Sequence, residues 1–241
     1  MEEVSAMKLR IRFGKHGAVK FIGHLDMMRF FQKAFRRAGF DLKYSQGYHP
    51  HPTLSFASPL GVGLESTGEY MDVEVLSITD PEQMKSDLNA QMAEGITIYS
   101  IVLLPDDAKN SMSLVAAADY SLAFREGMMP CDAGELKEKI DQFMQQDEIV
   151  VLKKTKKSER EVDIRPLIYD LRSDDQGVLH MQLSAGSAAN LKPELVMETF
   201  YRLEGFAADP YAWLVTRCEM YGDKGTNGER CLVSLERFDR A

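Results

Sequence analysis

The stretch M-K-L-R-I-R-F at residues 7–13 alternates apolar and basic side chains along its whole length. A period of two is typical of a β-strand that buries one face. After a short turn, apolar residues recur three and four positions apart: Leu25, Met28, Phe31, Phe35 and Ala38. That spacing places them on one face of a helix, which Gly39 is expected to end. The stretch therefore predicts a strand that leads into an amphipathic helix.

The rest of the first half extends this pattern. Further extended segments are expected at residues 41–45, 53–57 and 70–76, with a last strand at 96–103. Asp80 is a typical N-cap, and Pro81 is a typical first residue of a second helix. With the extended segments between the two helices forming two strands, the order is strand, helix, strand, strand, helix, strand, which is that of a ferredoxin-like split β-α-β domain.

The second half is expected to repeat the order. Strands are predicted at 119–124, 148–152, 178–183 and 214–221, and helices around 136–143 and 196–203. The sequence thus predicts an α+β fold of two tandem ferredoxin-like (split β-α-β) domains. The first domain would span 1–110 and the second 111–241, with a flexible linker at 105–113. A polar insertion near 153–175 is expected to form a protruding ribbon.

Composition narrows the class of protein. The chain has 241 residues, of which 44% are hydrophobic and 27% charged, as in ordinary globular proteins. No apolar run approaches the roughly 20 residues of a membrane span, and the first residues do not resemble a signal peptide. A cytoplasmic protein with no membrane partner is therefore expected. Its three cysteines form no C-x-x-C pair, which argues against a cofactor bound by cysteine motifs and indicates reduced thiols.

Charge is distributed unevenly along the chain. The formal net charge is −8, yet residues 8–58 contain ten Lys or Arg and only two Asp. An excess of eight positive charges in one segment predicts an anion-binding face, with RNA as the expected anion. Four of these cations, Arg29, Lys33, Arg36 and Arg37, are spaced to lie opposite the apolar stripe of the first helix. They are predicted to contact phosphates, although a merely solvated helix face is the alternative.

Histidines supply the candidate chemistry. The segment F-I-G-H-L-D at residues 21–26 brings His24 and Asp26 to the start of the first helix, where a capping role would also explain them. In S-Q-G-Y-H-P-H-P, at residues 45–52, each proline favours an extended residue before it, so His49 and His51 are expected to point the same way.

Four interpretations of these histidines stay open. His24, His49 and His51 would hold a divalent metal if they converge. With Asp26 they would act instead as acid and base on a phosphodiester. Tyr48, His49 and His51 would otherwise contact an RNA base, or form only a structural turn.

Several motifs resemble those of the bacterial radical-SAM-linked protein family: F-I-G-H-L-D-M-M-R at 21–29, S-Q-G-Y-H-P-H-P-T-L-S-F-A-S-P-L-G at 45–61, and G-E-Y-M-D at 68–72. The run R-E-V-D-I-R-P-L-I at 160–168 is similar as well. Members often accompany, or are fused behind, a cobalamin-binding radical SAM module. The resemblance implies a radical SAM partner but implies no activity for the chain itself. Because this chain has no C-x-x-x-C-x-x-C motif, it would act as a separate subunit.

These features together predict an accessory RNA-binding protein that presents RNA to a radical SAM enzyme. The rival hypothesis is an enzyme built on His24, His49 and His51, either a metal-dependent hydrolase or a metal-free ribonuclease. A third possibility is an adaptor whose basic face binds an acidic protein.

Overall fold

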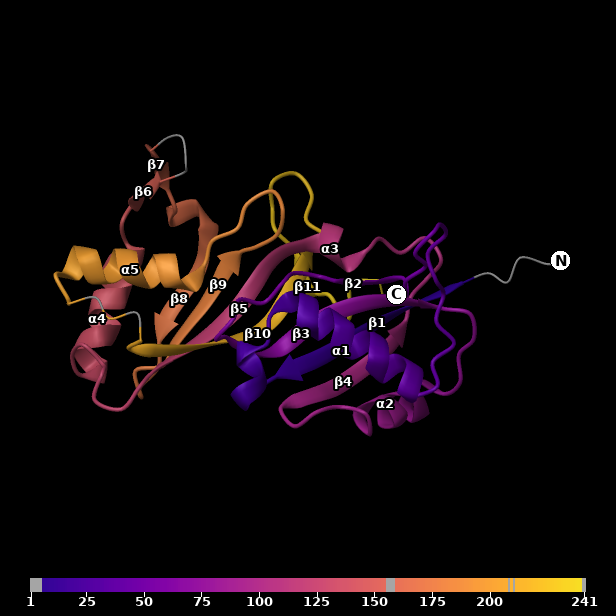
Figure 1. Ribbon diagram of the computed structural model, residues 1–241. Helices are drawn as coiled ribbons and strands as arrows, with labels where there is room; N and C mark the ends of the chain where they lie inside the picture. Colours follow the sequence, from indigo (N-terminus) through magenta and orange to yellow (C-terminus); the bar gives the residue numbers. More distant parts are fainter. Residues whose placement is uncertain (1–5, 155–158, 208, 210, 240–241) are drawn as a thin grey trace. The chain divides into compact units, whose positions relative to one another are not determined.

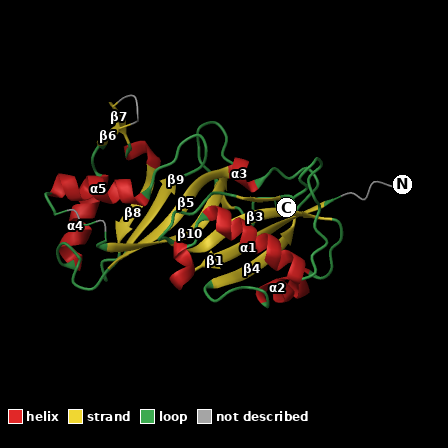
Figure 2. Ribbon diagram, in the orientation of Figure 1, coloured by secondary structure: helices red, strands yellow, loops and turns green. Residues whose placement is uncertain are grey.

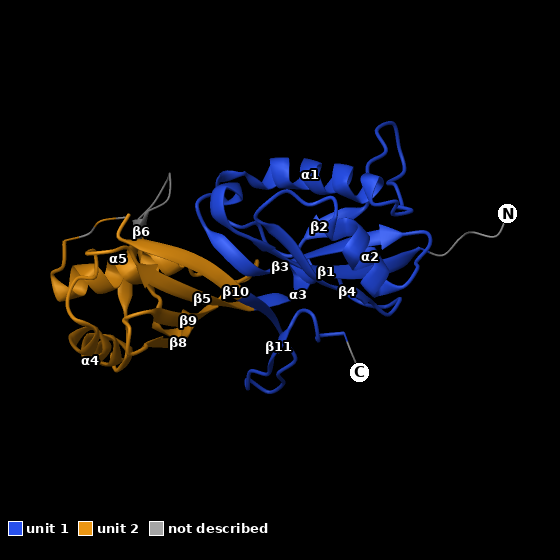
Figure 3. Ribbon diagram, turned by 90° about the horizontal axis from the view of Figure 1, so that it is seen from below, with its two compact units in different colours: residues 1–116, 219–241 blue, residues 117–218 orange. Residues whose placement is uncertain are grey.

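The computed structural model describes residues 6–154, 159–207, 209 and 211–239. These residues form a mixed α+β fold with a large, mostly antiparallel sheet and five α-helices (Figures 1 and 2). The chain divides into two compact units, which Figure 3 colours separately. Unit 1 comprises residues 1–116 and 219–241, and unit 2 comprises 117–218.

This division differs from the predicted boundary between residues 110 and 111. The last part of the chain, 219–241, belongs to unit 1 instead of to the second half. Two strands, β5 (Val115–Phe124) and β10 (Trp213–Asp223), contribute residues to both units. The predicted flexible linker also contains structure, since the short helix α3 (Ser111–Leu114) follows Asn110, whose side chain accepts a hydrogen bond from the Met112 N–H.

Unit 1 is built around β1 (Met7–Lys15), which confirms the strand predicted from residues 7–13. It pairs antiparallel with β3 (Glu65–Val75) on one side and β4 (Ile96–Leu103) on the other. The short strands β2 (Leu54–Phe56) and β11 (Leu232–Ser234) pair with β3 and β10, respectively. Leu9 lies opposite Val73 and Ile11 opposite Met71, so apolar side chains from neighbouring strands share one face.

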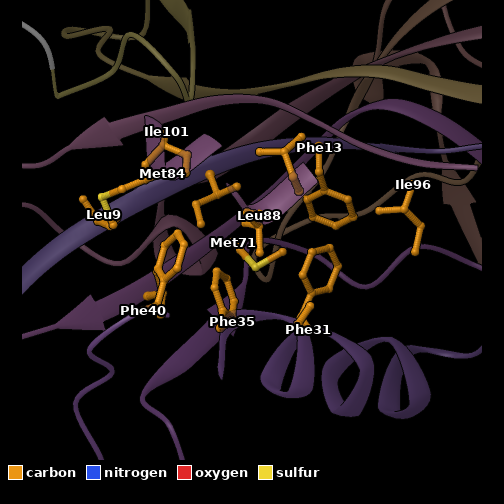
Figure 4. Close-up of a cluster of buried hydrophobic side chains, with 14 of the residues drawn as sticks. Leu9, Phe13, Phe31, Phe35, Phe40, Met71, Met84, Leu88, Ile96 and Ile101 are labelled. Atoms are coloured by element: carbon orange, nitrogen blue, oxygen red, sulfur yellow. The ribbon is translucent and has the colours of Figure 1, made fainter. Parts of the chain in front are cut away.

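Two helices cover that face: α1 (His24–Arg37) and α2 (Pro81–Asn89). A 3₁₀ turn, η1 (Gly17–Phe21), precedes α1. As predicted, Asp80 caps α2 by accepting a hydrogen bond from the Gln83 N–H, with Pro81 in the first turn. Phe31 and Phe35 of α1 point toward the strands in Figure 4 and are fully buried in the core.

The apolar stripe of α1 is rotated from the predicted one. Met27 and Ala34 are buried with Phe31 and Phe35, whereas Leu25 is 65% exposed. Apolar residues are dense around residues 25–31, so more than one stripe fits a 3.6-residue period. The choice between them is made by packing against the sheet.

The opposite face of β1 is also covered, which corrects the expectation of a strand with one buried face. Arg10 is 1% exposed, and its guanidinium forms an ion pair with Asp72 of β3, 2.8 Å from Nε to Oδ1. It also donates to the Leu235 carbonyl and binds Asp239 at 2.7 Å. The C-terminal segment therefore supplies partners to a buried cation in the first strand of the chain, which explains why it belongs to unit 1.

Unit 2 contains the main lengths of β5 and β10 together with β8 (Ile168–Ser173), β9 (Leu179–Ser184), α4 (Ala133–Met144) and α5 (Pro193–Glu204). The strand order is β10-β5-β9-β8. Both helices and the strands β5, β9 and β10 lie close to their predicted positions. Strand β8 was not predicted, because its residues fall within the expected polar insertion. Its buried residues are Ile168, Leu171 and Ser173, which do not follow a strict period of two.

The strand predicted at 148–152 lies outside the main sheet. It corresponds to β6 (Val150–Lys154), which pairs with β7 (Glu159–Asp163) in a separate two-stranded sheet, followed by the 3₁₀ turn η2 (Arg165–Leu167). Part of the predicted ribbon, 155–158, lies outside the described residues.

Two further expectations concern membranes and thiols. No helix in the described part of the chain has the length and apolar character that crossing a membrane requires. Cys131, Cys218 and Cys231 are free cysteines, consistent with the expected reduced thiols.

Candidate functional site

Much of the positive charge predicted for residues 8–58 is paired with carboxylates inside unit 1. Besides Arg10, Arg12 forms ion pairs with Glu219 at 3.2 Å and Glu236 at 3.5 Å. Lys20 pairs with Glu65 at 3.1 Å and Lys43 with Glu74 at 2.7 Å. All these carboxylates lie outside the counted segment, so a count along the sequence overestimates the charge that the folded surface presents.

The cations of α1 differ from these residues because they are accessible to solvent. Arg29, Lys33, Arg36 and Arg37 are all exposed, as predicted from their spacing. Arg29 forms an exposed ion pair with Asp26 at 3.2 Å, and Arg37 donates to the Gln91 carbonyl. Lys33 and Arg36 form no ion pair with any residue that the structure describes. The accessible cationic surface is thus concentrated on this helix.

The His-Pro-His-Pro segment forms a hairpin-like loop soon after α1 ends. Tyr44 and Pro52 form a β-bridge at its base, and the Ser45 N–H donates to the His51 carbonyl. The Ser45 hydroxyl lies 2.9 Å from His51 Nδ1 and accepts from the His51 N–H. Tyr48, at the tip, is fully exposed. The loop therefore holds His51 in place and presents Tyr48 to solvent.

His24 lies at the other end of α1 and is not grouped with His49 and His51. Its ring packs edge-on against Phe56, with the centroids 5.1 Å apart, whereas His51 contacts Ser45. A helix of the length of α1 spans about 20 Å, and it separates the two regions. Within the described ranges no three His, Cys, Asp or Glu side chains are placed to share a metal ion. The structure therefore does not bring together the three imidazoles of the predicted metal or ribonuclease site.

The capping role considered for His24 and Asp26 is not observed as a side-chain hydrogen bond at the start of α1. The N-cap of α1 is Gly23, which provides no side-chain hydrogen bond, and His24 is the first helical residue. Asp26 lies in the first turn, where a carboxylate interacts favourably with the helix dipole.

His24 lines a small cavity that the sequence did not predict. The wall residues come from β1, α1, β2, β3 and the loop after β2: Phe13, Lys15, His24, Met27, Phe56, Leu60 and Glu69. Its volume is about 20 Å³, or about 290 Å³ with the space at its open mouth. Four of these residues are apolar, so the cavity combines an apolar wall with an amine, an imidazole and a carboxylate.

Lys15 is the unusual member of this group. It is only 3% exposed, and its Nζ donates to the Ile22 carbonyl at 2.7 Å. Burial lowers the pKa of the Lys15 ammonium, and the charge of Glu69 partly offsets this shift. A lowered pKa increases the fraction of unprotonated, nucleophilic amine at neutral pH.

Glu69 is equally buried, with 3% of its surface exposed. It accepts a 2.6 Å hydrogen bond from the Ser66 hydroxyl, which orients the carboxylate. A buried amine, a positioned carboxylate and an imidazole on one cavity are groups that can exchange protons with a bound molecule.

A sequence signal for Lys15 and Glu69 did exist. Lys15 continues the row Leu9, Ile11, Phe13 at a spacing of two, and Glu69 precedes the row Met71, Val73, Val75 in the same way. A charged residue at the end of an apolar period-two row faces the core side of its strand. Their proximity, however, depends on the pairing of β1 with β3.

These observations define an α+β protein with an exposed cationic helix and a small cavity at the start of that helix. The chain belongs to a bacterial family, which it matches over residues 8–193 and which is described as "Uncharacterized protein conserved in bacteria (DUF2344)". That description names neither an activity nor a radical SAM protein.

Other comparisons add little. No curated protein matches the chain. A crystal structure described as an unknown protein from Galdieria sulphuraria shares 10% identity, covering 88% of this chain and 98% of that one, with a TM-score of 0.29. A likeness at this level supports no conclusion on fold or function.

Proposed function

We propose that this protein is an accessory RNA-binding protein that holds single-stranded RNA along the exposed face of α1. The observation that carries the proposal is the concentration of accessible cations on this helix, while Arg10, Arg12, Lys20 and Lys43 of the same segment form ion pairs within unit 1. Arg29 and Arg37 lie eight residues apart, about 12 Å along the axis, so the cations form a row that suits a run of phosphates.

The chemistry of the side chains favours phosphate. Three of the four cations are arginines, whose guanidinium groups bind phosphate oxygens through two parallel hydrogen bonds. Because these side chains are exposed, binding RNA does not require breaking a buried ion pair. The affinity should therefore depend strongly on salt, as expected for phosphate contacts.

Tyr48 supplies a second kind of contact. Its ring is fully exposed on a loop whose base is fixed by the Tyr44–Pro52 bridge and the Ser45–His51 hydrogen bonds. An exposed aromatic ring on an ordered loop suits stacking with an unpaired base, worth about 1–3 kcal/mol. His49 and His51 would lie beside that base, which gives them a role that needs no convergence with His24.

Fluorescence anisotropy with a labelled single-stranded RNA, at about 50 and about 200 mM salt, tests this function. We expect weaker binding at high salt, and a smaller salt dependence for the double variant Arg36→Glu, Arg37→Glu, because each lost phosphate contact lowers the slope by about one. Lys137→Glu changes an exposed cation on α4 and is the matched control. Binding that is absent, or insensitive to salt and to the α1 variants, would refute the proposal.

The partner and the location are proposed from the resemblance of sequence motifs. The resemblance of the motifs at 21–29 and 45–61 supports a radical SAM enzyme as partner, in the cytoplasm, with RNA modification or processing as the shared task. Affinity purification after nuclease treatment should recover a protein with iron–sulfur absorbance. Recovery of an acidic protein without a cluster would favour the adaptor hypothesis.

We also propose that each half of the sheet is ferredoxin-like. The order β4-β1-β3-β2 in unit 1 and the order β10-β5-β9-β8 around unit 2 support this assignment. Counted along each half, both orders read fourth, first, third, second, as expected for a tandem repeat of one strand-helix-strand-strand-helix-strand pattern.

A further inference from the structure

The cavity at the start of α1 has no role in RNA binding along the helix face, and its groups point to a separate activity. We propose that it is a carbonyl-binding site in which the amine of Lys15 forms an imine with a small aldehyde. This inference is independent of the proposed RNA binding, because none of the four cations of α1 lines the cavity.

The position of the Lys15 amine carries the proposal. Its ammonium has three N–H groups, and the Ile22 carbonyl accounts for one of them. The residue is almost completely removed from solvent, yet it lines an open cavity together with Glu69 and His24. A buried ammonium needs further polar partners, and the cavity is where a ligand can provide them.

The wall composition favours an amine that reacts as a nucleophile. Phe13, Phe56 and Met27 form an apolar surface around the polar groups. Apolar surroundings disfavour the charged form of an amine, which is the usual way in which proteins activate lysine toward carbonyl compounds. Glu69 and His24, on the same cavity, are available to accept and donate the protons of the reaction.

The reaction balances without an oxidant or reductant. Lys15 Nζ, as a free amine, adds to the carbonyl carbon, and the carbonyl oxygen takes a proton from His24 to give a carbinolamine that is protonated on nitrogen. The nitrogen then loses a proton to Glu69, which passes it to the carbinolamine hydroxyl, so that this group leaves as water when the C–O bond breaks. The iminium nitrogen returns its remaining acidic proton to His24, which leaves the imine. The net change is aldehyde plus amine to imine plus water.

The size of the cavity restricts the ligand. A volume of about 20 Å³ holds a group the size of one water molecule, and the mouth extends this space to about 290 Å³. Ligand pockets usually measure roughly 300–1,000 Å³, so the enclosed part of this cavity, at about 20 Å³, is far smaller than a usual ligand pocket. A short aldehyde, with its carbonyl group inside and a small apolar substituent at the mouth, fits these dimensions.

Reductive trapping tests the proposal on the full-length protein. Acetaldehyde and sodium cyanoborohydride at neutral pH convert an imine to an N-ethyl lysine, which peptide mass spectrometry assigns to a residue. We expect Lys15 to be labelled at a rate that saturates with acetaldehyde concentration. Lys33, an exposed amine on α1, is the internal reference and should be labelled more slowly and in linear proportion to concentration.

Two variants separate a site from a merely accessible amine. His24→Gln should lower the rate of Lys15 labelling by about tenfold or more, because general acid–base catalysis contributes at least this much, and leave Lys33 labelling unchanged. Lys15→Met should abolish the saturable component. Labelling of Lys15 that is no faster than that of Lys33, or that rises linearly with acetaldehyde, would overturn the proposal whatever the outcome for RNA.

Discussion

Two carboxylates near the C-terminal end of β10 illustrate how environment sets the behaviour of a single residue. Glu219 accepts a 2.6 Å hydrogen bond from the Tyr70 hydroxyl, but burial raises its pKa. Asp223 is exposed, and the N–H groups of Cys231 and Gly225 lower its pKa by hydrogen bonding to the carboxylate. As pH changes, the two groups should therefore change the free energy of unfolding in opposite directions.

Glu219→Gln and Asp223→Asn test this difference. Because the pKa of Glu219 is raised in the folded state, its contribution to the free energy of unfolding is present below the pKa of the unfolded state. This contribution is lost as pH rises through the pKa of the folded state. Because the pKa of Asp223 is lowered in the folded state, its contribution to the free energy of unfolding is present above the pKa of the unfolded state. This contribution is lost as pH falls through the pKa of the folded state.

Urea unfolding between about pH 3 and about pH 7, a range that spans the ordinary carboxyl pKa values, measures both effects. As pH rises through this range, Glu219→Gln should gain stability relative to the wild type, and Asp223→Asn should lose it. A parallel shift of both variants with pH would contradict the assignment of these two environments.

At the scale of elements, the helices differ in whether a side chain accepts a hydrogen bond from the backbone N–H groups of the first turn. Asp132 caps α4 by accepting from the Glu135 N–H at 3.0 Å, as Asp80 does for α2. In contrast, Gly23 gives α1 no side-chain cap. Helix α1 therefore depends on tertiary packing of Phe31 and Phe35 more than on local signals.

Asp132→Ala should reduce the free energy of unfolding by about 1 kcal/mol, because an uncapped N–H is left at the start of α4. Asp175→Ala is a matched control, since Asp175 is highly exposed and its 3.6 Å ion pair with Lys137 should contribute little. Chemical denaturation of both variants measures the difference. Equal stabilities would mean that the cap contributes nothing in this context.

At the scale of the whole molecule, the first and last parts of the chain form one unit. Arg10 needs Asp239 and the Leu235 carbonyl, and Arg12 needs Glu219 and Glu236. Removing one partner of a buried ion pair costs roughly 3–5 kcal/mol. Domains are stable by only about 5–15 kcal/mol, so such losses are large.

A fragment of residues 1–110 should therefore not fold cooperatively. The complementary comparison is a single chain in which residues 1–116 are joined by a flexible linker to 219–241, which should restore cooperative unfolding. Circular dichroism during urea titration measures both. A sharp transition for the 1–110 fragment would show that the C-terminal segment is dispensable.

Local sequence patterns predicted most of the elements of this fold. The alternation at 7–13 and the Asp80-Pro81 start of α2 are confirmed, because period and capping act within a few residues. The exposed cations of α1 follow from the same logic, since helical spacing alone separates them from the buried Phe31 and Phe35. The sequence by itself determined these features.

Tertiary structure decided the rest. It left His24 at one end of α1 and the loop that carries His49 and His51 beyond the other, and it paired Arg10 and Arg12 with carboxylates more than 200 positions away in the sequence. It also brought Lys15 and Glu69 to one cavity through the pairing of β1 with β3. Such contacts depend on strand register and on chain segments far apart in sequence, and neither leaves a signal in local periodicity or charge.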